Sequence, residues 1–250
     1  MQKKIEKIQD FLHKESKKRG FESVVFGLSG GIDSAVVGKL CVSVFGSKAR
    51  AFIMPSFASN PKNTQDAVSF ARSINLQYEL IDISHTLQSF VEMLNLYKTP
   101  DFHRIGNISA RIRMITLFDK SIVHNALVIG CSNKSEIMLG YGTIFGDLAC
   151  GINPIGGLFK SEIFTLAKKL DIPSHIISKK PSADLYIGQS DEGDLGYSYS
   201  DIDKILKQIQ KGASAKTLID SGFNKKFVES IFRRVKKNAF KSEMPKILTL

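Results

Sequence analysis

The feature that most constrains the fold is a short apolar run that leads through a glycine-rich turn directly into a helix. Residues 23–28 (SVVFGL) form an almost continuous apolar stretch, which is typical of a strand buried on both faces of a parallel sheet. Ser29-Gly30-Gly31 follows, and Asp33-Ser34 opens a helix whose apolar positions continue to Phe45. A strand, a turn and a helix in this order begin a strand–helix–strand unit, so we expect an α/β fold.

The same alternation recurs along the chain. Further strands are predicted at 51–54, 77–83 and 126–130, and helices at 2–19, 64–74, 84–97, 107–124, 160–170, 201–210, 214–221 and 224–238. The glycine-rich stretch 140–157 and the polar stretch 179–200 are predicted loops, the second a candidate lid over a site. We therefore predict a doubly wound parallel sheet, Rossmann-like, in a single domain covering residues 1–250.

The net charge of +11 would suit a nucleic-acid partner if it followed one track. It does not, because residues 1–20 carry seven basic and three acidic side chains, and residues 224–246 carry eight and two. The stretch between them is nearly balanced, with twenty basic and nineteen acidic side chains. The excess positive charge therefore lies in the terminal helices, and we predict no nucleic-acid partner.

The chain also lacks the patterns of secreted and membrane proteins. The basic start has no apolar stretch behind it, and no apolar run approaches the roughly 18 residues that a membrane span requires. Three cysteines, Cys41, Cys131 and Cys150, have neither paired nor zinc-like spacing. We expect a cytoplasmic protein with no membrane partner and with buried, reduced cysteines.

Gly27 to Ser34 is the segment with the most specific chemistry. Backbone N–H groups at the start of a helix converge on an anion, and Gly30 and Gly31 lack the Cβ atoms that would obstruct it. The Ser29 and Ser34 hydroxyls can add donors. The loop has no GxxxxGK[ST] pattern and is not a Walker A motif. An ordinary turn capped by Asp33 is the alternative.

The string SGGIDS at 29–34 resembles the signature loop of the ATP-pyrophosphatases, which cleave ATP between the α- and β-phosphates to adenylate a substrate. Four more segments, in order and spacing, resemble the ammonia-dependent NAD synthetases: GNISARIRM at 106–114, SNKSE at 132–136, GD at 146–147 and PSADL at 181–185. The resemblance implies an adenine-nucleotide α-hydrolase-like fold, a homodimer and no glutaminase domain. It also implies amidation of deamido-NAD by ammonia to give NAD, AMP and pyrophosphate, through an adenylate.

The resemblance carries functional residues over, position by position. It implies ATP contacts for Gly27, Leu28, Ser29, Gly30, Gly31, Ile32, Asp33, Ser34, Cys131, Lys160 and Ser182. It implies substrate contacts for Arg111, Asp147 and Lys241, and Mg²⁺ contacts for Asp33 and Glu136. Two carboxylates completed by phosphates and waters suit that ion. Asp33 and Lys160 are the expected catalytic residues.

Four positions depart from the pattern of the family it resembles. Cys131 stands where Thr is usual, Ile144 where Lys is common, Gly151 where Asp often contacts deamido-NAD, and Phe240 where His often precedes the lysine. The ATP site is therefore closer to the family pattern than the substrate site.

Other interpretations remain open from the residues themselves. Arg111 could be a solvated helix charge, and Glu136 a carboxylate at a helix N-terminus. A tRNA-modifying ATP-pyrophosphatase would use the same loop, although the chain lacks a CxxC pair for thiolation. A nucleotide sensor without turnover is disfavoured by the presence of both Asp33 and Glu136.

Overall fold

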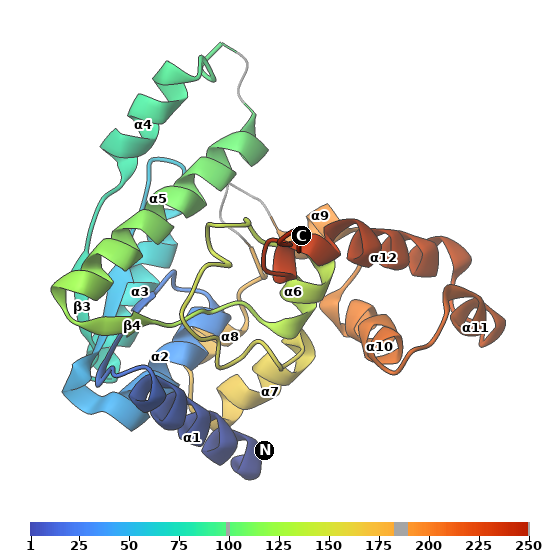
Figure 1. Cartoon of the computed structure of the whole chain (residues 1–250), viewed down its shortest axis with the longest axis horizontal. Coiled ribbons are helices and arrows are strands. Elements are labelled where there is room, and N and C mark those ends of the chain that lie inside the picture. Colours follow the sequence, from blue (N-terminus) through green and yellow to red (C-terminus); the bar gives the residue numbers. More distant parts are fainter. Residues whose placement is uncertain (99–100, 183–189, 250) are drawn as a thin grey trace.

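Four parallel strands form one sheet in the computed structural model, which describes residues 1–98, 101–182 and 190–249. They are β1 (Ser23–Gly27), β2 (Ala49–Ile53), β3 (Gln77–Leu80) and β4 (Ala126–Val128). Their spatial order is β3-β2-β1-β4, and every pairing is parallel. The predicted parallel α/β sheet is confirmed (Figure 1).

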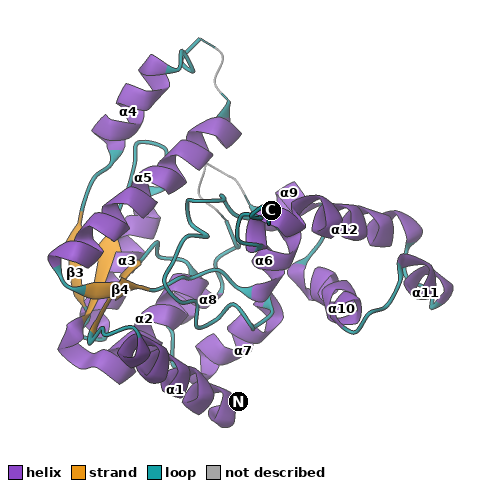
Figure 2. Cartoon of the chain, in the orientation of Figure 1, coloured by secondary structure: helices purple, strands orange, loops and turns teal. Residues whose placement is uncertain are grey.

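Helices make up most of the rest of the described chain (Figure 2). The first seven are α1 (Gln2–Lys18), α2 (Ile32–Phe45), α3 (Pro61–Ser73), α4 (Ser84–Met93), α5 (Phe102–Val123), α6 (Lys134–Leu139) and α7 (Lys160–Lys169). They are followed by α8 (Ser174–Ile177), α9 (Asp191–Leu195), α10 (Tyr199–Gln210), α11 (Ala215–Asp220) and α12 (Lys225–Asn238). Two short 3-10 turns, Gly46–Lys48 and Ala239–Ser242, follow α2 and α12.

Helices cover both faces of the sheet. Because successive strand residues point to opposite sides, neighbouring residues belong to different cores. Phe26 and Ala51 belong to a core shared with α1, α2, α3 and α7. Val25 and Phe52 belong to a second core, on the other face, shared with α4 and α5. β1 is therefore apolar on both sides, which is why residues 23–28 could be recognised from the sequence, whereas the edge strand β3 (QYEL) is only partly covered.

A third apolar cluster lies away from the sheet. It joins α6 to α10, α11 and α12 through residues such as Leu139, Ile202 and Val228. These C-terminal helices project to one side of the sheet in Figure 1 and contact the rest of the molecule through α6 and α7. Across the described residues, no helix combines the length and apolar character needed to cross a membrane.

The strand order reverses next to β1. The chain runs from β1 outward to β2 and β3 and then returns to add β4 on the other side of β1. Parallel sheets bind ligands at such a switch point, beyond the carboxyl ends of the strands. The segments that follow β1 and β4 begin at Leu28 and Ile129, so the predicted ATP loop and the SNKSE segment follow the two strands at the switch point.

Several boundaries differ from the sequence prediction. The long helix begins at Phe102 rather than at 107, because the Asp101 carboxylate accepts a hydrogen bond from the Arg104 N–H (3.1 Å) and caps it. β3 ends at Leu80 and α4 at Met93, both earlier than predicted. Within the predicted lid at 179–200, the segment 190–200 includes α9, while 183–189 lie outside the described residues.

Gly30 tests how tightly the loop after β1 is packed. It has φ +80°, and a Cβ there would lie 2.2 Å from the backbone oxygen of Asn63. We expect Gly30→Ala to lower the free energy of unfolding by about 1–3 kcal/mol. Gly38, inside α2, is the control, since its Cβ would meet only side chains at 3.5 Å and alanine favours helices by up to about 1 kcal/mol. Urea unfolding measures both, and equal stabilities would contradict the packing argument.

Candidate active site

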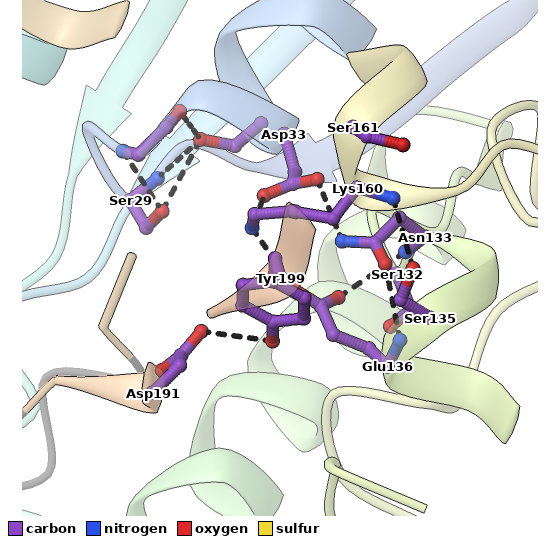
Figure 3. Close-up of polar contacts among 12 residues, drawn as sticks. Ser29, Asp33, Ser132, Asn133, Ser135, Glu136, Lys160, Ser161, Asp191 and Tyr199 are labelled. Carbon is purple, nitrogen blue, oxygen red and sulfur yellow. Dashed lines mark hydrogen bonds and ion pairs between the residues drawn. The ribbon is translucent and has the colours of Figure 1, made fainter. Parts of the chain in front are cut away.

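A buried lysine lies between two carboxylates that come from the segments after β1 and β4. The Lys160 ammonium, at the start of α7, is 2.5 Å from Asp33 Oδ2 and 3.1 Å from Glu136 Oε1. The side chain of Lys160 is only 3% exposed. Asp33 comes from α2 and Glu136 from α6, so three helix starts meet at this point (Figure 3). The structure thus brings together three of the residues predicted for the ATP and metal sites.

Asp33 does not cap its own helix. The N-cap of α2 is Gly31, which forms no side-chain cap bond, and Asp33 lies inside the helix. Its carboxylate instead contacts Lys160 and accepts a hydrogen bond from the Asn133 side-chain amide (2.9 Å). The alternative of an ordinary turn capped by Asp33 is therefore wrong.

Glu136 has two roles at once. Its Oε2 accepts a hydrogen bond from the Asn133 N–H (3.2 Å), while the Asn133 side chain accepts one from the Glu136 N–H (3.0 Å). This capping box starts α6 and fixes the rotamer of Glu136. The other oxygen, Oε1, is left to face Lys160. The helix-terminal interpretation of Glu136 is thus correct, and it explains how the carboxylate is aimed.

The charges in this cluster are unequal. Burial opposes the charged form of Lys160, but the Asp33 and Glu136 carboxylates outweigh it and raise the pKa of the lysine. Burial also raises the pKa of Glu136; Lys160 opposes this rise and Asp33 adds to it. Two carboxylates share one ammonium, so the cluster favours a further positive charge.

Residues that were not predicted hold Lys160 in place. Its backbone N–H donates to Ser135 Oγ (2.9 Å), and Asp203 accepts from Ser135 Oγ (2.5 Å) and from the Ser161 N–H (2.8 Å). The Lys160 ammonium also lies over the Tyr199 ring, 5.3 Å from its centroid. Asp203 and Tyr199 come from α10, more than thirty residues further along, so no local pattern indicates them. The N-x-x-E spacing of the capping box is the one local signal that could have indicated Asn133.

The predicted phosphate loop, residues 27–34, is held together by hydrogen bonds of its own serines. Ser34 Oγ donates to the Gly31 carbonyl (3.0 Å) and accepts from the Ser29 N–H (3.2 Å). The Gly31 N–H lies 3.3 Å from Ser29 Oγ. The two hydroxyls therefore shape the loop as well as offering donors. Ile32 and Leu28 are buried in the core beside the loop, so they contribute through their backbone.

Cys131 and Ser182 occupy the margins of the predicted ATP site. The Cys131 thiol donates weakly to the Gly27 carbonyl (3.7 Å), and burial raises the pKa of this thiol, so it stays neutral. Ser182 is exposed at the end of a described segment. The next three residues of the predicted PSADL motif, 183–185, lie outside the described residues.

The three predicted substrate residues surround a different loop, residues 140–147. Arg111 reaches the Ile144 carbonyl (3.4 Å), and Asp147 Oδ1 accepts from the Thr143 N–H (2.8 Å). The Lys241 ammonium donates to the carbonyls of residues 140 (2.8 Å) and 142 (3.0 Å). These residues come from α5, the loop itself and the turn after α12, and the structure brings them together.

The structure shows the surroundings of two positions that depart from the family pattern, Gly151 and Ile144. A Cβ on Gly151 would lie 2.4 Å from Leu127 Cδ1, so the backbone there leaves no room for an aspartate without a shift. Ile144 contributes its carbonyl to Arg111. Arg111 is itself exposed on α5, so its interpretation as a solvated helix charge stays open beside the predicted substrate contact.

The donor set suits a hard divalent cation. Asp33 Oδ2 and Glu136 Oε1 converge on the Lys160 ammonium, so these carboxylates lie close together, and a divalent cation would bind beside the lysine and share them with it. Within the described ranges, no group of three or more His, Cys, Asp or Glu side chains forms a metal cluster. Phosphate oxygens and waters would have to complete the coordination, as Mg²⁺ sites commonly require.

A glycine-rich turn lies at the switch point of a parallel sheet, with a buried lysine and two carboxylates beside it, and this arrangement is typical of nucleotide-dependent α/β enzymes. The family model for NAD synthase matches residues 4–245, and the chain belongs to that family.

Known proteins are similar to this chain over nearly its whole length. The NH(3)-dependent NAD(+) synthetase of Helicobacter pylori (strain HPAG1) is 51% identical, over 98% of this chain and 95% of the relative. The NH3-dependent NAD synthetase structure from Campylobacter jejuni, solved with a nitrate ion, is 39% identical with a TM-score of 0.84, covering 99% and 98% of the two chains. The NMN synthetase structure from Francisella tularensis is 31% identical with a TM-score of 0.88, covering 100% and 98%. The predicted family is confirmed, and the tRNA-modifying alternative is not supported.

Lys160→Met tests the energetics of the buried cluster. It leaves Asp33 and Glu136 without their cation, and breaking such a pair costs about 3–5 kcal/mol of unfolding free energy. Lys120→Met is the control, because Lys120 pairs with Glu79 (2.8 Å) nearer the surface, where the loss is about 1 kcal/mol or less. Chemical denaturation compares the two, and a smaller loss for Lys160→Met than for Lys120→Met would refute the argument.

Proposed function

We propose that this chain amidates the nicotinate carboxylate of deamido-NAD with ammonia, consuming ATP and releasing NAD, AMP and pyrophosphate. The observation that carries the proposal is the Lys160–Asp33–Glu136 cluster beside the phosphate loop. It occurs in a chain that is 51% identical to an NH(3)-dependent NAD(+) synthetase over nearly its full length.

The reaction takes place in two steps. A carboxylate oxygen attacks the α-phosphorus of ATP, the bond to the bridging oxygen breaks, and pyrophosphate leaves an acyl-adenylate. Ammonia then attacks the acyl carbon and loses a proton. The bond between that carbon and the phosphate oxygen breaks, and AMP leaves with the oxygen. The Lys160 ammonium and the N–H groups at the start of α2 offset the charge that develops on pyrophosphate.

The remaining assignments follow the two groups of residues in the site. ATP would lie along residues 27–34, with Cys131 and Ser182 at its margins, and Asp33 and Glu136 would hold Mg²⁺. A magnesium ion held there would compensate charge on the phosphate oxygens. Deamido-NAD lies against the loop contacted by Arg111, Asp147 and Lys241. The enzyme works in the cytoplasm without a nucleic-acid or membrane partner, in keeping with basic charge confined to the terminal helices.

A homodimer is the assembly that the surface of α5 supports. Ile115, Phe118 and Ile122 are 60%, 39% and 82% exposed and follow one another at helical spacing. Arg111 precedes them on the same face of the helix. A two-fold axis beside this apolar stripe would bury it against its own copy. The substrate residue Arg111 would then lie at the edge of the interface.

The function is tested by following three products together. Purified protein with ATP, Mg²⁺, ammonium and deamido-NAD is expected to give NAD, AMP and pyrophosphate in equal amounts. A parallel reaction offers nicotinic acid mononucleotide, since one similar structure is an NMN synthetase. Faster turnover of the mononucleotide would replace the proposed substrate, and absence of AMP with either substrate would reject the activity.

Asp33→Asn tests the adenylation step. The variant removes one carboxylate charge while Glu136 still pairs with Lys160, so the fold is expected to persist. AMP formation is expected to fall about 100-fold or more, since charge stabilisation in such sites is worth that much. Asp220→Asn, on the exposed end of α11, is the matched control. AMP release within threefold of wild type would remove Asp33 from the mechanism.

The dimer is tested by mass and by kinetics. Light scattering at micromolar concentration is expected to give twice the chain mass for wild type and the single mass for Ile122→Asp, because the charge would be buried in the interface. Arg111→Ala is expected to raise the KM for deamido-NAD about tenfold, the effect of about 1.4 kcal/mol, without changing the KM for ATP. A monomeric wild type with full activity would disprove the proposed interface.

A further inference from the structure

Lys179 links three segments that are far apart in the sequence. Its ammonium donates to the Gly30 carbonyl (2.9 Å) and to Asn63 Oδ1 (2.8 Å), and it forms an ion pair with Asp66 Oδ2 (2.7 Å). Gly30 belongs to the phosphate loop, and Asn63 and Asp66 belong to α3. Lys179 itself follows α8 and stands three residues before Ser182. Its three contacts thus join the phosphate loop to α3, next to the segment that leads to Ser182.

The contact with Gly30 fixes the direction of a peptide group. A trans peptide is planar, and its carbonyl oxygen and amide hydrogen point to opposite sides. With the Gly30 oxygen turned toward Lys179, the Gly31 N–H of the same peptide points away from the lysine, toward Ser29 Oγ. A glycine at φ +80° has wide conformational freedom, so this peptide needs an external partner to hold it.

Packing around Gly30 makes the anchor rigid. The Asn63 backbone oxygen lies so close to Gly30 that a Cβ would approach it to 2.2 Å. Asn60 caps α3 by accepting from the Lys62 N–H (3.0 Å), which fixes this end of the helix. Asp66 is only 8% exposed, and the Lys179 ammonium balances its charge. The Lys179 ammonium is therefore held by the phosphate loop and α3 rather than by solvent.

We infer that Lys179 is a positioning residue for the ATP phosphates. It holds the Gly30 carbonyl away from the anion, fixes the Gly30–Gly31 peptide and with it the hydrogen bond from the Gly31 N–H to Ser29 Oγ that shapes the loop, and keeps the Ser182 segment beside the loop. It acts through the loop and does not itself touch the nucleotide. The inference rests on the proposed function, because it assigns the phosphates to this loop.

The experiment separates phosphate binding from nucleoside binding. Calorimetry with Mg²⁺ measures the dissociation constants of ATP, pyrophosphate and adenosine for wild type, Lys179→Met, Lys179→Arg and Lys120→Met. Lys120 has an ion pair and a side-chain exposure close to those of Lys179, 22% against 24%, and lies far from the loop, on α5. Asn63→Ala adds a milder change, because it removes one acceptor and keeps the ion pair with Asp66. Thermal melts establish which variants fold.

Lys179→Met is expected to weaken ATP and pyrophosphate about tenfold and to leave adenosine within twofold of wild type. Lys179→Arg restores part of the loss, Asn63→Ala gives a smaller loss of the same kind, and Lys120→Met changes nothing. Unchanged pyrophosphate affinity in Lys179→Met would overturn the inference, as would an equal loss for adenosine. If Lys179→Met does not fold, Asn63→Ala decides by the same criterion. Wild type and Lys120→Met that bind neither ATP nor pyrophosphate would instead reject the proposed function.

Discussion

The rest of the site depends on one buried ammonium shared by two carboxylates. Lys160 at the start of α7 contacts Asp33 from α2 and Glu136 from α6, so the segments that follow β1 and β4 are joined through one side chain. A buried pair of this kind is costly to form and costly to break, and it contributes position more than stability. It fixes where the phosphate loop lies relative to α6, while burial, with Asp33 close by, raises the pKa of the second carboxyl, Glu136, to about 8.

The sequence was most informative where structure and chemistry are local. A strand covered on both faces has to be apolar throughout, so residues 23–28 stood out, and the turn that follows shows its anion-binding character in its glycines. Helix ends were less predictable, since the start of α5 depends on the Asp101 cap, and the α6 capping box was recognised only in part. Such ends are set by single side-chain hydrogen bonds, which compete closely with alternatives one turn away.

Contacts between distant segments could not be predicted from the sequence. The resemblance brought Asp33, Glu136 and Lys160 to one site, yet nothing in it indicated that the lysine pairs with both carboxylates. Tyr199 lies beneath Lys160 only because the C-terminal helices pack on α6 and α7. A tyrosine at helical spacing in an apolar stripe looks like any core residue. Its contact with Lys160 can be recognised only in the tertiary fold.

The two groups of functional residues are held at a fixed separation by α6. This short helix begins with Glu136 in its first turn, beside Lys160, and ends at Gly140, whose carbonyl accepts from Lys241. Gly140 has φ +60°, and a Cβ there would lie 2.2 Å from Asn238 Cβ, so α12 packs directly on the end of the helix. The Asn238 amide also donates to the Leu139 carbonyl (3.0 Å). A carboxylate and an adenylating phosphate must meet at bonding distance, and small misplacements are costly in rate. The C-terminal helices therefore act on the site from outside it, because they fix the far end of α6, which connects the predicted ATP residues with the predicted substrate loop.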